Sequence, residues 1–192
     1  MANDQCEIKL IVGLGNPGSQ YDHTRHNIGV DFLYLLADKY KINLSPEAKF
    51  SGITGRGSIN GQEVRLVYPT TFMNESGRSI GAICNFYKIK PDQVLVCHDD
   101  LDLNPGYMKF KFGGGLAGHN GLKSITANLS NSQNYYRLRL GIGKPPSKEV
   151  INWVLGRPSP NDKKLIDDAY ATALVAIDKL FKEGVAKATA LI

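Results

Sequence analysis

The sequence predicts an α/β fold: a three-layer single domain in which helices flank a mixed, mostly parallel twisted sheet. Short apolar runs typical of strands alternate along the chain with longer segments whose apolar residues recur at helical spacing. An Asn60-Gly61 pair indicates one tight hairpin, which interrupts this alternation and makes the sheet mixed. The length of 192 residues suits one well-buried domain, and no linker, internal repeat or low-complexity tract divides residues 1–192.

In the first half of the chain, each predicted element follows from a local pattern. Residues 8–12 form a run that is apolar apart from Lys9, as expected of a strand buried on both faces. Apolar side chains then recur at helical spacing from Ile28 to Leu36, and Asn27 offers an N-cap for this helix. The hairpin turn joins two further strands, residues 50–56 and 63–68.

The second half continues the alternation of helices and strands. Residues 75–87 carry apolar side chains at helical spacing, and Pro91 stops this helix from extending. Residues 136–142 alternate with period two, which is typical of a strand, and residues 162–183 have one apolar helical face. The remaining predicted elements are strands at 94–97 and 108–112 and a helix over 122–129.

The segment Gly13 to Gly18 spells G-x-G-x-x-G directly after the first strand, a pattern typical of dinucleotide binding. In that fingerprint the helix opens within the glycines, so that its amides face a pyrophosphate. Here Pro17 removes one amide, and the polar residues 19–27 intervene before helical spacing begins. We therefore interpret the motif as a tight loop that presents Asn16 and leads to His26, as in a hydrolytic site. A nucleotide-dependent oxidoreductase is the alternative for this motif.

Polar side chains follow several predicted strands, at the edge of the sheet where α/β proteins bind ligands. His26 lies beyond the first strand, Met73-Asn74 beyond the second hairpin strand, and His98 to Asp102 beyond residues 94–97. A carboxylate can pair with an imidazole and fix its tautomer, so that the other ring nitrogen acts as a base. No G-x-S-x-G elbow favours a serine nucleophile, so water activated by a general base is the simpler chemistry.

Two weaker patterns indicate metal ligands. His23 and His26 have a spacing that can chelate a metal, but a single pair is a weak signal. The carboxylates of Asp99, Asp100 and Asp102 could hold Mg²⁺, or Asp99 could simply cap a turn.

Positive charge is concentrated in one part of the chain. The net charge is +5, yet residues 103–150 hold seven basic residues against one acid, which leaves −1 for the remainder. This asymmetry favours an anionic partner, most often nucleic acid, with a solvated surface as the alternative. The glycines at 113–118 can expose amides as an anion-binding nest, with Lys109 and Lys111 on the same side and Asn120 capping the next helix.

Composition narrows the class of protein further. The three cysteines are odd in number and form no C-x-x-C pair, which argues against structural disulfides and a thiolate zinc site. No apolar run approaches the roughly 20 residues that span a bilayer, and the N-terminal residues 1–7 show no export signal. We therefore expect a cytoplasmic protein that does not enter a membrane.

Five separated motifs, in register from about Ile8 to Thr189, resemble bacterial peptidyl-tRNA hydrolase. Such agreement over nearly the whole chain is specific, although each motif alone is weak. The motifs are Gly13-Leu14-Gly15-Asn16-Pro17-Gly18, Thr24-Arg25-His26-Asn27, Pro69-Thr70-Thr71-Phe72-Met73-Asn74, His98-Asp99-Asp100-Leu101-Asp102 and Gly118-His119-Asn120-Gly121. The chain departs from the usual family pattern at Leu116-Ala117, in the loop that borders the cleft.

The resemblance implies cleavage of the ester that joins a peptide to the 3′-terminal ribose of tRNA, in a monomer without metal or cofactor. It implies that His26 is the general base that activates water, that Asp99 orients it, and that Asn16 belongs to the catalytic group. The other implied contacts are Tyr21, Met73, Asn74 and Asn120 with the substrate, and Lys109, Lys111, Arg139 and Lys148 with tRNA phosphates. A non-catalytic RNA-binding relative is the alternative function.

Overall fold

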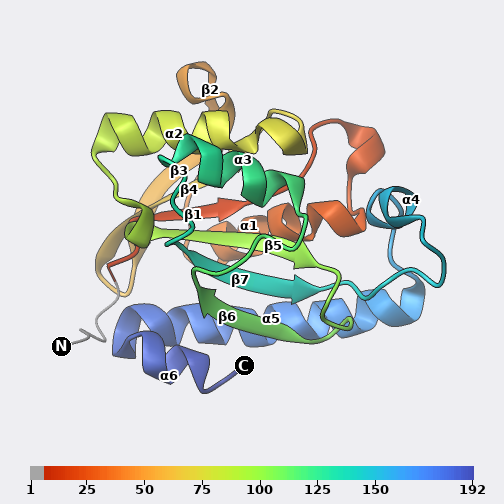
Figure 1. Ribbon diagram of the computed structural model, residues 1–192. Coiled ribbons are helices and arrows are strands. Elements are labelled where there is room, and N and C mark those ends of the chain that lie inside the picture. Colours follow the sequence, from red (N-terminus) through yellow and green to blue (C-terminus); the bar gives the residue numbers. More distant parts are fainter. Residues whose placement is uncertain (1–6) are drawn as a thin grey trace.

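The computed structural model describes residues 7–192, which fold around one seven-stranded sheet (Figure 1). Along the sheet the strands follow the order β2-β3-β4-β1-β5-β7-β6. The strands are β1 (Leu10–Gly13), β2 (Ser45–Glu47), β3 (Gly52–Ile59), β4 (Gln62–Pro69), β5 (Val94–Asp100), β6 (Met108–Phe112) and β7 (Tyr136–Gly141).

The centre of the sheet is parallel and its edges are antiparallel. Strands β4, β1, β5 and β7 pair in parallel, whereas β2–β3, β3–β4 and β6–β7 are antiparallel. The β3–β4 hairpin turns at Asn60 and Gly61, whose positive φ angles of 50° and 82° are those of a type I′ turn. These pairings confirm the predicted mixed sheet and its hairpin. Parallel and antiparallel pairings are equal in number, three each, because antiparallel strands extend both edges of the sheet that was predicted to be mostly parallel.

Helices cover both faces of the sheet, which confirms the predicted three layers (Figure 1). On one face, Phe32 and Ile177 belong to a core cluster with sheet residues such as Leu138. On the other face, Ile80 and Ile125 pack in a second cluster. The helices of the first face are α1 (Ile28–Lys39), α5 (Pro160–Glu183) and α6 (Val185–Thr189), and those of the second are α2 (Ser76–Tyr87) and α3 (Asn120–Asn128).

Several element boundaries differ from the sequence prediction. The short elements β2, α4 (Val150–Val154) and α6 were not predicted, because three to five residues are too few to show a period. Strand β1 begins at Leu10 and β3 at Gly52, each two residues later than expected. Strand β5 runs on to Asp100, so the polar side chains expected beyond this strand belong to its last residues.

Both predicted asparagine caps are corrected by the structure. Asn27 occupies the N-cap position of α1 but makes no capping bond, because its side-chain amide binds the backbone of Asn16 instead. The cap of α3 is His119, whose side chain accepts from the amides of Gly121 and Leu122. Asn120 is instead the first residue of that helix.

Cys84 and Cys97 are buried and unpaired, and burial raises the pKa of the Cys84 thiol to about 12. Cys6 and most of the N-terminal segment on which the export prediction rests lie outside the described residues. Within residues 7–192, no helix is both long and apolar enough to cross a membrane.

Candidate active site

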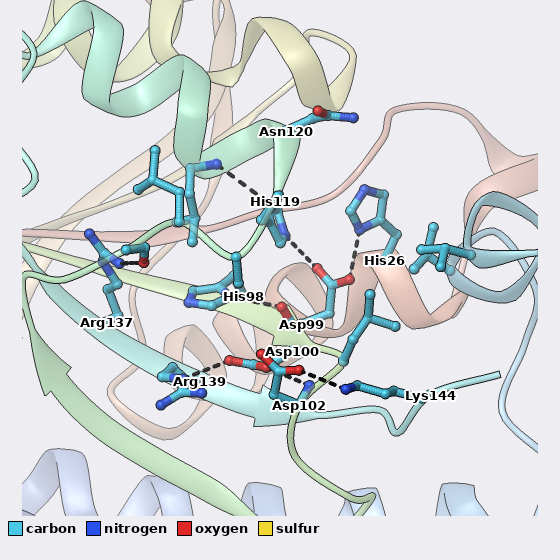
Figure 2. Close-up of a pocket in the computed structure, with 18 of the residues that line it drawn as sticks. His26, His98, Asp99, Asp100, Asp102, His119, Asn120, Arg137, Arg139 and Lys144 are labelled. Atoms are coloured by element: carbon cyan, nitrogen blue, oxygen red, sulfur yellow. Dashed lines mark hydrogen bonds and ion pairs between the residues drawn. The ribbon is translucent and has the colours of Figure 1, made fainter. Parts of the chain in front are cut away.

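A pocket of about 590 Å³ opens at the carboxyl end of β5 (Figure 2). His98, Asp99 and Asp100 of that strand line it. The glycine-rich loop before α3 forms one wall, and α4 with the loop that precedes it forms another. Ligand binding at this edge is the rule for a sheet with parallel central strands.

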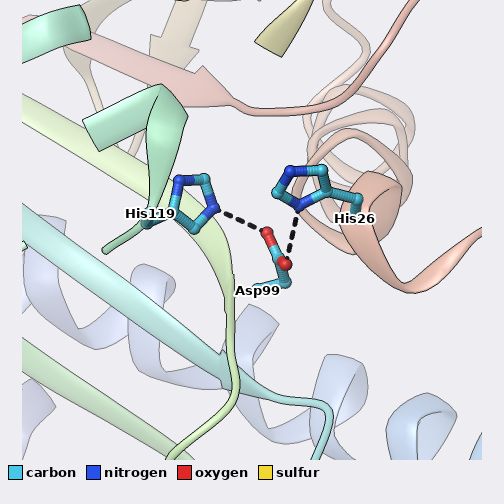
Figure 3. Close-up of side chains that lie close together, drawn as sticks. All are labelled: His26, Asp99 and His119. Carbon is cyan, nitrogen blue, oxygen red and sulfur yellow. Dashed lines mark hydrogen bonds and ion pairs between the residues drawn. The ribbon is translucent and has the colours of Figure 1, made fainter. Parts of the chain in front are cut away.

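Asp99 lies between two histidines that come from distant parts of the chain (Figure 3). One carboxylate oxygen lies 2.8 Å from Nδ1 of His26, and the other lies 2.8 Å from Nε2 of His119. His26 belongs to a single 3-10 turn, η2 (Arg25–Asn27), which leads directly into α1. Both Asp99 oxygens therefore accept hydrogen bonds, and the three side chains form one hydrogen-bonded unit.

The hydrogen bonds of His119 fix its tautomer. Its Nδ1 accepts from the backbone amides of Gly121 and Leu122 at 3.1 and 3.3 Å, so this nitrogen carries no proton. The proton of the neutral ring is on Nε2, where it is donated to Asp99. His119 is thus held as a neutral donor, whereas His26 uses Nδ1 as its donor and keeps Nε2 for another partner.

Burial and charge act in opposite directions on this unit. Burial of the His26 ring opposes its charged form, but the charge and hydrogen bond of Asp99 outweigh this effect and raise the pKa of His26. Burial likewise opposes the charge of Asp99, yet the two histidines hold its pKa well below the usual range. Asp99 is therefore a carboxylate that stabilises positive charge on His26.

His98 contributes to this unit through the backbone of Asp99. Its Nδ1 lies 2.8 Å from the backbone carbonyl oxygen of Asp99, to which it donates. Burial, together with the neighbouring His119, lowers the pKa of His98 to about 4, so this ring is neutral near pH 7. The backbone of Asp99 is fixed in this way as well as its side chain.

Asn16 is held tightly next to the turn that carries His26. The side-chain amide of Asn27 accepts from the Asn16 backbone N–H at 2.8 Å and donates to its carbonyl at 2.9 Å. The Tyr68 hydroxyl donates to the same carbonyl at 3.0 Å. The Oδ1 atom of Asn16 accepts from the backbone N–H of Met73, also at 2.8 Å. Asn16 thus connects the end of β1, the His26 turn and the segment that begins at Met73.

The structure separates the predicted site residues into two groups. His26, Asp99, Asn120, Lys111 and Arg139 line the pocket. The others lie outside its lining: Asn16 and Met73 are buried, Tyr21 is half-buried, and Asn74, Lys109 and Lys148 are exposed.

Four cations share one face of the sheet edge. Residue pairing places Lys109 opposite Arg139 and Lys111 opposite Arg137, on the face away from Leu138 and the α5 layer. Like charges directly opposite each other destabilise a sheet, so an arrangement of this kind favours an anionic partner. Arg139 also donates to Asp100 at 2.6 Å (Figure 2).

Arg137 is the least exposed of these cations and holds the glycine loop. Only 2% of its surface is accessible, and its guanidinium donates to the carbonyls of Gly115 and Gly114 at 2.6 and 3.1 Å. The expected anion-binding nest is therefore not seen at these two glycines, whose carbonyls face a cation. The sequence pattern indicated no role for His119 or Arg137, although His119 stands in the motif shortly before the helix predicted over 122–129.

The metal sets considered from sequence do not come together. His23 pairs with Asp31 at 3.2 Å and does not join His26. Asp100 pairs with Arg139, and Asp102 pairs with Lys144 at 3.3 Å. Within the described part of the chain, the one group of metal-ligand types is His26, Asp99 and His119, whose candidate ligand atoms lie within 4.8 Å of one another. The expectation of a metal-free site stays a prediction.

Known proteins resemble this chain over almost its full length. A family model described as peptidyl-tRNA hydrolase matches residues 10–192. A peptidyl-tRNA hydrolase from Histophilus somni is 55% identical over 184 residues, which cover 95% of each chain. Its counterpart from Haemophilus influenzae is 51% identical over the same share.

A solved structure agrees with these sequence comparisons. The crystal structure of peptidyl-tRNA hydrolase from Acinetobacter baumannii superimposes with a TM-score of 0.93 at 47% identity, covering 99% of this chain and 96% of that one. The family match and the shared fold extend over the elements that build the pocket. The chain belongs to the peptidyl-tRNA hydrolase family.

Proposed function

We propose that this protein is an enzyme that hydrolyses the ester between a peptide and the 3′-terminal ribose of tRNA. Family membership supports the reaction. The observation that carries the chemistry is His26, whose Nδ1 is bound to Asp99 while its Nε2 makes no hydrogen bond within residues 7–192. A histidine held in this way is a general base for water.

The reaction then proceeds by proton transfer through His26. Nε2 removes a proton from water as the water oxygen attacks the ester carbonyl, and Asp99 stabilises the imidazolium that forms. Collapse of the tetrahedral intermediate breaks the bond to the ribose oxygen, and His26 returns the proton to that leaving oxygen. The products are tRNA with its ribose hydroxyl restored and a peptide with a free carboxyl group, which then loses its proton to solvent.

Amide side chains are suited to place the substrate in this reaction. Asn120 stands at the start of α3 and lines the pocket near His26 (Figure 2). Its amide can hold the attacking water or the substrate carbonyl, because it both donates and accepts. We assign Asn16 and Asn74 to the placement of the peptide and the 3′ end, and Tyr21 and Met73 to further contacts with the substrate.

The basic sheet edge supplies the tRNA contacts in this proposal. Lys109 and Lys111 of β6 and Arg139 of β7 share one face, and Lys148 is exposed in the loop before α4. Phosphates bound there would place the acceptor end of tRNA beside the pocket that holds His26. The expected monomeric state and cytoplasmic location stay predictions.

The alternative, a non-catalytic RNA-binding relative, is separated from this proposal by one assay. We expect the protein to discharge N-acetyl-aminoacyl-tRNA and to spare free aminoacyl-tRNA, because the substrate has a peptide-like amide where free aminoacyl-tRNA has a charged amine. Tight tRNA binding without release of the blocked amino acid would support the alternative instead.

A further inference from the structure

Besides the bonds to Asp99 and Asn16, the structure gives the His26 turn a further attachment, through the neighbouring residue Arg25. The Arg25 guanidinium lies 3.5 Å from the centre of the Trp153 indole ring, and it donates to the Trp153 carbonyl at 2.9 Å. The Arg25 backbone N–H donates to the carbonyl of Gly156, also at 2.9 Å. These contacts join η2 to α4 and the residues that follow it, which lie beside the segment leading into α1 (Figure 1).

Trp153 is itself fixed from the other side. Its indole Nε1 donates to the carbonyl of Gly143 at 2.9 Å, near the start of the loop that follows β7. The ring is therefore anchored to the sheet while its face receives Arg25. We call Arg25 and Trp153, with the carbonyls of Gly143 and Gly156, the arginine clasp.

Burying Arg25 is costly, which argues that the arginine clasp does more than fill space. Only 8% of the Arg25 surface is accessible, and burial lowers its pKa, with the charge of Asp162 partly offsetting that effect. A buried guanidinium held by carbonyls and an aromatic face contributes little to the free energy of unfolding, because an apolar side chain in its place would avoid the cost of desolvation. Its planar fork and its stacking surface instead define one orientation for the turn that bears His26.

The helix that holds Arg25 is also a wall of the pocket. Val150, Ile151 and Val154 of α4 line the pocket, and 73% of the Ile151 surface is accessible. A ligand in the pocket would contact the same five-residue helix that carries Trp153. The arginine clasp therefore connects the substrate wall directly to the residue next to the base.

We propose that Arg25 and Trp153 are positioning residues that orient His26, so that Nδ1 stays on Asp99 while Nε2 faces the substrate. The inference rests on the proposed hydrolysis of peptidyl-tRNA. It extends the catalytic arrangement to two side chains that do not touch the reacting atoms.

The test compares Arg25→Lys, Trp153→Phe and the double variant in hydrolysis of N-acetyl-aminoacyl-tRNA. Lysine keeps the charge but loses the fork and the stack, and phenylalanine keeps a ring but loses the indole N–H. We expect each single change to lower kcat by about tenfold or more, since small misplacements of a base are costly, with KM within about threefold of the wild type. The double variant should lose no more than the worse single variant, because both residues act as one unit.

The matched control is Arg157→Lys, since Arg157 is an exposed arginine near the same turn whose Nε donates to the carbonyl of Asp22 at 3.1 Å. We expect its kcat to stay within about twofold of the wild type. Folding is followed in every variant by thermal unfolding, and in the variants that keep Trp153, the single tryptophan of the chain, also by its emission. If Arg25→Lys does not fold, Trp153→Phe, which leaves the cation in place, decides the question.

Three results would overturn the proposal: unchanged kcat in folded single variants, a loss carried by KM alone, or losses that multiply in the double variant. Wild-type turnover separates this inference from the proposed function. An inactive wild type would refute the hydrolase proposal, whereas an active wild type with unaffected variants would refute only the role of the arginine clasp.

Discussion

Among single residues, Asp99 organises the site because it accepts hydrogen bonds from two histidines that play different parts. His119 is fixed as a neutral donor by the helix amides bound to its Nδ1. Within residues 7–192 no hydrogen bond holds Nε2 of His26, so we propose that this ring takes up and releases the proton. Asp99 therefore binds two imidazoles for which we propose different roles, a structural role for His119 and a reactive role for His26.

Replacing Asp99 with asparagine should move the pH dependence of the reaction. Asp99 raises the pKa of His26 against the effect of burial, so in the wild type the base becomes neutral only as pH rises through this raised pKa. Without the charge, burial dominates and the pKa falls below its usual value of about 6.5. The acidic limb of the pH–rate profile should shift to lower pH, while the plateau falls by about 10²–10⁴-fold. An acidic limb that stays in place would contradict this assignment.

Two substitutions at His119 should separate its two roles. Asparagine is a good N-cap, so His119→Asn keeps the start of α3 and loses the bond to Asp99. We expect nearly unchanged thermal stability with a rate about tenfold lower, as for a displaced catalytic group. His119→Ala should also lose about 1 kcal/mol of stability, because the cap is removed. Equal losses of stability in the two variants would contradict the capping role of His119 at α3.

At the scale of elements, the site depends on how closely α1 approaches the sheet. Gly29, in the first turn of α1, faces the backbone of β5, and a Cβ there would lie 2.2 Å from the Cys97 carbonyl oxygen. Helix α1 begins directly after the His26 turn, so the packing of α1 against β5 also determines the position of His26 relative to Asp99. The position tolerates glycine alone for reasons of space.

Gly29→Ala should therefore destabilise the protein and impair the reaction together. Alanine gains up to about 1 kcal/mol in helix propensity, but overpacking against backbone costs about 1–3 kcal/mol or more. Gly81→Ala in α2 is the comparison, because a Cβ there lies 3.1 Å from its nearest atom, the Asn128 carbonyl oxygen, a tight contact that a shift of a few tenths of an ångström relieves. Thermal unfolding should show a lower melting temperature for Gly29→Ala alone. A melting temperature unchanged or raised in both variants would mean that α1 can move away from β5.

The elements that sequence patterns predicted well are those with many periodic residues. Helix α5 and the β3–β4 hairpin carry strong local signals, an apolar face and an Asn-Gly turn. Helix α4 carries none, and its five residues are ordered by a cation from far along the chain, Arg25. Chemistry predicted that an imidazole and a carboxylate could pair at this edge, and the family resemblance selected His26 and Asp99 for the pair. The hydrogen bonds that fix His119 depend on helix geometry that spacing does not show. The same holds for Asn27, whose side chain serves a distant loop in place of its own helix.

At the scale of the whole molecule, charge is divided between two regions. The net charge of +5 is the sum of +6 from residues 103–150 and −1 from the rest of the chain. Four of the cations in residues 103–150 form two directly opposed pairs on β6 and β7. Only Arg139 of the four has a carboxylate partner among the described ion pairs, Asp100. The exposed Lys109 and Lys111 thus place positive charge next to the pocket, which suits the proposed tRNA substrate.

Salt should therefore weaken tRNA binding in a graded way. Each lysine that neutralises one phosphate contributes about 0.7–0.9 to the slope of log affinity against log salt concentration. Lys109→Gln should weaken binding and reduce this slope by about one. Lys164→Gln, an exposed position on α5, should change neither quantity. A slope that is flat in the wild type would remove the phosphate role of the sheet edge.

The central claim, that His26 held by Asp99 is the general base, is tested most directly by single-turnover hydrolysis of N-acetyl-aminoacyl-tRNA with excess enzyme. This design measures the chemical step at saturation, and the affinity for deacylated tRNA is measured in parallel. We expect His26→Ala to slow hydrolysis by at least about 10²-fold while tRNA affinity stays within about threefold. A rate within a few-fold of the wild type at saturating His26→Ala enzyme would contradict the assignment.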